Sequence, residues 1–140
     1  MATVNMFTDT KNQILLGTHN FNGNTFRVAL NPNGTPPVVG NTTLASLATQ
    51  ILYTNVVGGV APQVTITETG GVVTGTALTI TAGASAVPTF RWYTIYNDTA
   101  ASKNLVCFCD HGSDITLAAG ETFTIKWNSS ATTGTIFSVA

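Results

Sequence analysis

Charged side chains are scarce in this sequence. Only 5 Lys and Arg and 6 Asp and Glu occur among 140 residues, so that 8% of the chain is charged, about a third of the usual share. The net charge of -1 and the lack of a basic run exclude the electrostatic footprint of a nucleic-acid-binding protein. The surface must consist largely of neutral polar groups, which leaves little repulsion between closely packed copies.

Long apolar runs and targeting signals are also missing. No apolar run approaches the roughly 18 residues that a membrane-spanning helix needs. The first residues, MATVNMFTDTKNQ, lack the basic start and apolar centre of a secretory signal. We therefore expect a protein that is made in a cytoplasm and has no membrane partner.

Cysteine is rare, with Cys107 and Cys109 as the two in the chain. Two cysteines do not make a disulfide framework. In a strand both would point to one face with Phe108 on the other, and a bridge between them would be strained. We expect two reduced core cysteines.

Threonine, glycine and asparagine are abundant instead. The chain has 26 Thr, 13 Gly and 12 Asn, a composition that favours sheet and turns over helix. Apolar alternation at roughly ten-residue spacing indicates eight or nine strands, and no repeat or linker divides the chain. The pattern predicts an all-β fold, a jelly-roll-like β-sandwich of about eight strands with one short helix, as a single domain over residues 1–140.

The centre of this pattern is the stretch 88–110, which reads as two apolar strands joined by a polar loop. One face of the first strand is expected to carry Phe90, Trp92, Thr94 and Tyr96, and the other face Arg91, Tyr93 and Ile95. Because both strands are apolar on both faces, we expect an inner strand pair, or one face turned to a partner. Further strands are expected over residues 25–30, 51–57, 63–68, 72–82, 115–117, 121–127 and 135–139.

Helical spacing is convincing only over residues 42–50, where Leu44, Leu47 and Ala48 share a face. The segment 5–16 is open to two interpretations. Asp9 or Thr10 could cap a short helix that ends at Gly17, or residues 1–12 could form an extended arm that docks elsewhere. Three of the 5 Pro fall within residues 31–41, which predicts a loop, and Gly70-Gly71 is a hairpin turn signal.

Residues with catalytic or metal-binding chemistry are few. Cys107, Cys109, Asp110 and His111 are metal-ligand types within five residues, but a complete site needs more ligands, and the other histidine is His19. Two small core residues that run into a polar turn are the simpler interpretation. We predict no metal and no cofactor.

Two further constellations have similar alternatives. The residues around Gly112 are the types of a hydrolytic triad, but they are more often a turn, and the sequence has no G-x-S-x-G elbow. They are Asp110, His111, Ser113 and Asp114. Trp92 and Trp127 could form a sugar-stacking platform, although their positions in strands favour the core. We predict that the chain is not an enzyme, which favours a structural or binding role.

Three stretches resemble small virion-associated structural proteins of tailed bacteriophages. The first is LLGTHNF at 15–21 with NTFRVAL at 24–30, where that group has a leucine-leucine-glycine turn and a "T-F-K-V-A-L" strand. The second is Trp92 with IYN at 95–97, where the group has an "I-Y-N" strand end. The third is 106–112 with GETFTI at 120–125, which is similar to an apolar strand ending "D-F-G" and a "G-x-F-T-V" strand. His111 replaces the usual aromatic residue, and GGVAP at 58–62 matches more loosely.

The resemblance covers most of residues 11–139 and implies a capsid decoration, or cement, protein on the surface of the phage head. Its implied partners are the major capsid protein and further copies of itself, as a homodimer or homotrimer. The expected contact residues lie in the N-terminal segment and the proline-rich loop: Val4, Asn5, Met6, Phe7, Pro32, Pro36, Pro37 and Val38. The alternative is a tail component or a receptor-binding, sugar-binding β domain.

Overall fold

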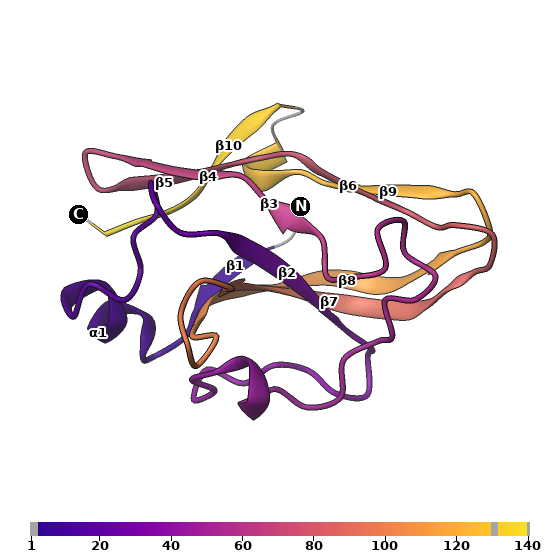
Figure 1. Cartoon of the computed structure of the whole chain (residues 1–140), viewed down its shortest axis with the longest axis horizontal. Coiled ribbons are helices and arrows are strands. Elements are labelled where there is room, and N and C mark those ends of the chain that lie inside the picture. Colours follow the sequence, from indigo (N-terminus) through magenta and orange to yellow (C-terminus); the bar gives the residue numbers. More distant parts are fainter. Residues whose placement is uncertain (1–2, 130–131, 140) are drawn as a thin grey trace.

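The computed structural model describes residues 3–129 and 132–139 (Figure 1). Its elements, in chain order, are β1 (Thr3–Met6), α1 (Thr10–Leu15), β2 (Phe26–Asn31), the 3-10 turn η1 (Leu44–Ser46), β3 (Gln63–Val64), β4 (Ile66–Thr69), β5 (Val72–Thr76), β6 (Leu78–Thr81), β7 (Val87–Asn97), β8 (Leu105–Leu117), β9 (Thr122–Ile125), the 3-10 turn η2 (Trp127–Ser129) and β10 (Thr133–Ser138).

The strands form one larger and two smaller antiparallel sheets. The main sheet has the order β1-β8-β7-β2-β3, and the smaller sheets have the orders β10-β5-β4 and β6-β9. Figure 1 shows the two smaller sheets along one side of the main sheet. The prediction of a mostly β protein with a short helix is confirmed, whereas the jelly-roll topology stays a prediction.

The larger apolar core lies between the main sheet and the two smaller sheets. The main sheet contributes Leu30 and Phe90, and the smaller sheets contribute Ile80 and Ile125 from the β6–β9 pair. The Trp127 ring is buried in this core, and its Nε1 donates to the Thr76 carbonyl at 2.9 Å. This burial of apolar side chains is the main force that holds the two layers together.

Residues 32–62, hereafter the covering segment, cover the opposite face of the main sheet with their first and last parts. Between these parts, Ile51 and Val56 join the larger core, and the Val57 N–H donates to the Thr81 carbonyl at the end of β6.

A second apolar cluster lies beneath the covering segment, in which Phe108 of β8 and Tyr96 of β7 pack with Leu47 and Ala61 of the segment. The β7–β8 hairpin is therefore buried on both faces. This explains why both of its strands are apolar on both faces, and it confirms the prediction of an inner strand pair.

A bulge in β8 changes the predicted faces of the hairpin. Phe90 pairs with Ile115 and Trp92 with Asp110, so that four residues of β8 lie opposite one residue of β7. Phe90 consequently joins Tyr93 in the larger core, and the prediction that it shares a face with Trp92 is wrong. The predicted turn at 110–114 is this bulge within a continuous strand.

Two further local predictions need correction. The predicted helix over 42–50 is only the turn η1, and no strand forms over 51–57 apart from a single bridge between Val56 and Ala82. Both segments belong to the covering segment. Its contacts with the main sheet outweigh the weak helix and strand propensities of these short stretches.

The N-terminal residues form a strand and a helix. In the structure β1 pairs with β8 through Val4–Cys109 and Met6–Cys107. The helix α1 follows, and the Thr10 hydroxyl donates to the Val106 carbonyl at 2.5 Å. The helix interpretation is confirmed, and the arm interpretation is wrong for residues 3–12, because this backbone is paired within the fold. Residues 1–2 of that arm lie outside the described residues.

The outer face of the smaller sheets is built from threonines in register. Thr67 of β4 pairs with Thr74 of β5, which pairs in turn with Thr135 of β10. The hydroxyls of Thr67 and Thr74 lie 3.0 Å apart, as do those of Thr79 and Thr124 in the β6–β9 pair. Such cross-strand pairs stabilise a sheet, which accounts for much of the threonine content.

The packing between the layers is tight around Gly75. A Cβ at this position would lie 2.8 Å from Ile136 Cδ1 and 2.9 Å from the Trp127 ring. Gly75→Ala should therefore lower the free energy of unfolding, measured in urea, by about 1–3 kcal/mol through overpacking. Gly34→Ala is the matched control, since its Cβ would meet nothing within 4 Å. An equal effect of the two substitutions would contradict this account of the core.

Candidate contact surface

The two segments predicted to make contacts lie side by side. The backbone N–H of Thr8, which follows β1, donates to the Val39 carbonyl of the covering segment at 2.9 Å. The edge strand β1 and the start of the covering segment therefore belong to one region. Because the two segments are far apart in the sequence, the sequence alone did not indicate that they are neighbours.

The predicted contact residues differ in exposure. Asn5, Pro36 and Val38 are exposed, and Val4, Met6 and Pro32 are half-buried. Phe7 is only 2% exposed and packs on the Phe108 ring at a centroid distance of 4.9 Å, and Pro37 is also buried. Phe7 and Pro37 are thus interior residues in this structure, and Phe7 belongs to the apolar cluster beneath the covering segment. For the other six, contact with a partner stays a prediction.

Sequence reasoning missed most of the exposed apolar side chains of the covering segment. Five of the eight large hydrophobic residues that are exposed in the described chain lie there: Val38, Val39, Leu52, Val57 and Val60. None of the 11 charged residues falls within residues 28–67. This uncharged run was the signal in the sequence that marks the segment as a neutral surface.

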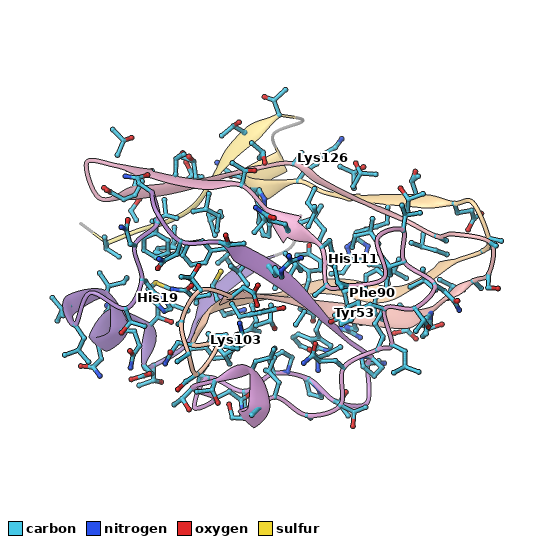
Figure 2. The ribbon with its side chains drawn as sticks, viewed as in Figure 1. His19, Tyr53, Phe90, Lys103, His111 and Lys126 are labelled. Atoms are coloured by element: carbon cyan, nitrogen blue, oxygen red, sulfur yellow. The ribbon has the colours of Figure 1, made fainter. Side chains whose placement is uncertain are left out.

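Specific hydrogen bonds fix the covering segment to β2. The Ile51 N–H donates to the Leu30 carbonyl at 2.9 Å, and the Leu30 N–H donates to the Tyr53 hydroxyl at 2.9 Å. That hydroxyl donates in turn to Gln50 Oε1 at 2.7 Å (Figure 2). Burial raises the pKa of Tyr53, which keeps its hydroxyl protonated as a donor. These bonds hold residues 50–53 against β2, and ordering of this part before a partner binds lowers the entropy cost of binding.

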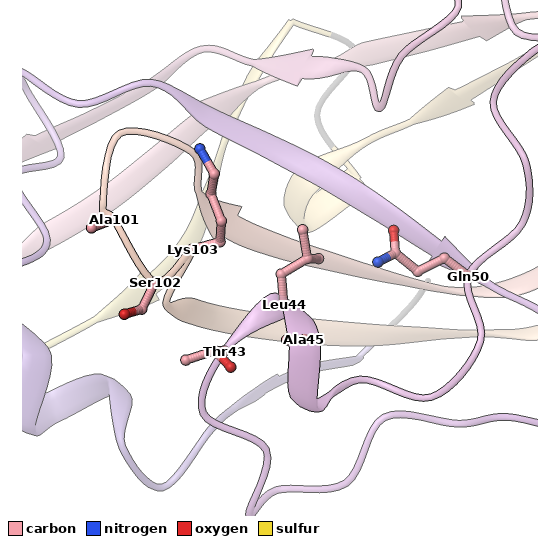
Figure 3. Close-up of a pocket in the computed structure, with 7 residues that line it drawn as sticks. All are labelled: Thr43, Leu44, Ala45, Gln50, Ala101, Ser102 and Lys103. Atoms are coloured by element: carbon pink, nitrogen blue, oxygen red, sulfur yellow. The ribbon is translucent and has the colours of Figure 1, made fainter.

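An open hollow of about 560 Å³ lies between the covering segment and the β7–β8 loop (Figure 3). Its lining comprises Thr43, Leu44, Ala45, Gln50, Ala101, Ser102 and Lys103. The Lys103 ammonium pairs with Asp98 Oδ1 at 3.0 Å, and this hydrogen bond lowers the pKa of Asp98. Asp98 also pairs with Arg27 Nε at 3.1 Å, so the cluster of two cations and one carboxylate keeps a net positive charge beside the hollow.

The residues considered as metal ligands are divided between the core and the surface. Cys107 and Cys109 are free thiols buried in the larger core, as predicted, and burial raises the pKa of Cys109 to about 12. Asp110 lies outside that core and accepts two hydrogen bonds from Arg91, at 2.7 and 2.9 Å. Within the described ranges, no group of three or more His, Cys, Asp and Glu residues is placed to hold a metal ion.

The residues considered for catalysis and sugar stacking are placed differently. His111 is exposed on the bulge with its ring 5.1 Å from that of Phe123, and Ser113 and Asp114 are also exposed. Trp127 is a core residue, and Trp92 is half-buried with the Arg91 guanidinium 5.6 Å from its ring centroid. The two tryptophans therefore do not form one flat platform.

A buried histidine anchors the turn that follows α1 (Figure 2). His19 Nε2 lies 3.2 Å from the Leu105 carbonyl, and Nδ1 lies 3.3 Å from the Asn97 amide nitrogen. Since a carbonyl only accepts, Nε2 carries the proton. Nδ1 faces the Asn97 amide nitrogen, which donates to the Thr18 carbonyl and to Asn24 Oδ1 at 2.9 Å each. The neighbouring Leu15, at the end of α1, is 86% exposed and lines a groove with Ile14 and Val139.

No helix among the described residues is long and apolar enough to cross a bilayer. No protein-family model, curated protein or solved structure matches the chain. The candidate contact surface consists of the uncharged covering segment, with its exposed valines and leucine, next to the edge strand β1.

Burial lowers the pKa of His19 and so links stability to pH. The unfolded chain binds a proton at this residue as the pH falls below about 6.5, whereas the folded chain resists it. The free energy of unfolding should therefore decrease as the pH falls from about 7 to about 5.5. Above this range, the full contribution of neutral His19 to stability should be present. His19→Gln should flatten this slope in urea titrations at several pH values. An unchanged slope in the variant would show that another group is responsible.

Proposed function

We propose that this chain is a capsid decoration protein, which binds the outer surface of a phage head and stabilises contacts between major capsid subunits. The observation that carries the proposal is the uncharged contact surface on the covering segment. It would be made in the cytoplasm of the bacterial host and would reside on the virion. A jelly-roll arrangement of its strands, and a homodimer or homotrimer on the shell, belong to the same proposal.

The chemistry of the surface suits a protein partner with a large neutral face. Leu52 is 72% exposed and Val38 58%, so their burial in a contact would release water from apolar area. No charged group of residues 28–67 would have to be desolvated. Tight contact therefore needs no matching charges on the partner, which fits repeated binding across a shell.

A decoration protein would stabilise the capsid shell by mass action. A protein that binds only the expanded shell stabilises that shell in proportion to the logarithm of its free concentration over its dissociation constant. This role needs a stable scaffold and a preformed surface, and no catalytic group. The three stretches that resemble virion-associated phage proteins support the choice of a phage head. The alternative, a sugar-binding tail component, has less support because the two tryptophans do not make a common platform.

Copy number in purified virions tests the proposal. The chain is quantified against the major capsid protein by mass spectrometry with labelled standard peptides. Decoration predicts a near-equal or simple fractional ratio, in the hundreds of copies per particle. A few to a few dozen copies would instead assign the protein to the tail, and its absence from virions would contradict a structural role.

Charge introduced on the covering segment should weaken binding to the shell. We expect Val38→Lys and Leu52→Lys each to reduce occupancy of shells lacking the protein about tenfold or more, because a buried unpaired ammonium is costly to desolvate. Thr67→Lys is the control, since Thr67 is exposed on the threonine face of the opposite layer. Equal loss in all three variants, each verified as folded, would argue against this contact surface.

A further inference from the structure

Three buried polar atoms lie without a hydrogen-bond partner in the part of the chain that the structure describes. They are Asn31 Oδ1, Trp92 Nε1 and Thr94 Oγ1. Asn31 and Thr94 are 0% exposed. Most buried polar atoms in native proteins are satisfied by protein groups or ordered water, because an unpaired one costs about 1–3 kcal/mol. Three such atoms in one chain therefore call for a common explanation.

The sheet register places the three side chains together. Asn31 of β2 pairs directly with Trp92 of β7, and Thr94 lies two residues further along β7 on the same face. Direct cross-strand neighbours have Cβ atoms about 4.5–5.5 Å apart, and diagonal ones about 7–8 Å. The face is the one beneath the covering segment, since Thr94 pairs with Phe108 and Trp92 packs on the apolar cluster there.

The hydrogen bonds of Asn31 orient its free oxygen. Its Nδ2 donates to the carbonyls of Ala48 and Thr49, at 3.2 and 3.0 Å, in the covering segment. Both amide protons are thus used, and Oδ1 remains as an acceptor. The cluster therefore contains one acceptor, one obligatory donor in the indole of Trp92, and one hydroxyl that can do either.

We propose that these three atoms bind one internal water molecule at the seam between the main sheet and the covering segment. The water accepts a hydrogen bond from Trp92 Nε1 and donates to Asn31 Oδ1 and Thr94 Oγ1. Three hydrogen bonds are the usual complement of a buried water. An ion is a poor fit, because the site pairs a donor-only group with an acceptor-only group and contains no charged atom. The proposal is independent of the function on the shell.

The bound water ties β7 to the covering segment through Asn31. Because Asn31 bonds to the Ala48 and Thr49 carbonyls, lifting of that part of the segment from the sheet would open a route for the water to bulk solvent. The residence time of the water would then report how often the base of the contact surface opens. Magnetic relaxation dispersion of water protons in solutions of the protein gives that time directly.

The direction in which one substitution shifts the urea midpoint of unfolding tests the site. If the Thr94 hydroxyl were unpaired, Thr94→Val would remove a desolvated group and raise the urea midpoint of unfolding. If the hydroxyl binds the water, the same change leaves the water with two partners and lowers the midpoint. Thr122→Val on the exposed face of β9 is the matched control for the general preference of strands for valine.

We expect Thr94→Val to lie below this control in urea midpoint, and a high-resolution crystal structure to show one water within hydrogen-bonding distance of all three atoms. A Thr94→Val midpoint at or above that of the control would overturn the proposal. Direct hydrogen bonds among the three side chains, or a dry site, would overturn it as well.

Discussion

Burial of the β7–β8 hairpin on both faces is the constraint on which the rest of the structure depends. One face carries Phe90 and needs the two smaller sheets as a cover, and the other carries Phe108 and needs the covering segment. A lone sheet with two apolar faces would expose too much hydrocarbon to remain soluble. The two smaller sheets and the covering segment are therefore needed to bury the apolar side chains of one hairpin.

The few charges of the chain lie outside the covering segment in sequence, but three cations reach it in space. Arg27 donates to the Ala61 carbonyl, Arg91 donates to Asn33 Oδ1, and Lys103 lines the hollow beside Leu44. Arg27, Asp98 and Lys103 form one cluster of ion pairs, and Arg91 pairs with Asp110 at the bulge. These partly exposed pairs contribute little to stability, and no charged residue lies within the covering segment itself. The outer face of the smaller sheets carries threonine hydroxyls in register, and the covering segment carries exposed valines and a leucine. The covering segment is the better candidate for contact because its side chains gain more from leaving water.

Local pattern predicted much of the fold and little of the contact surface. Alternation placed β2, β5 and β9 correctly, and Gly70-Gly71 does form the hairpin turn between β4 and β5. The bulge in β8 could not be predicted, because it is a mismatch in length between two strands that appears only when they pair. The shape of the covering segment could not be predicted either, since it depends on hydrogen bonds with Leu30 and Asn31 of β2. The burial of Phe7 could not be predicted because Phe108, on which its ring packs, is remote in sequence.

Hydrogen–deuterium exchange of the chain, free and bound to phage shells that lack it, tests the central claim most directly. The account predicts that binding slows exchange in residues 32–62 and in β1, while the threonine strands β4 and β5 exchange as in the free protein. Protection centred on β4, β5 and β10, with residues 32–62 unchanged, would contradict it.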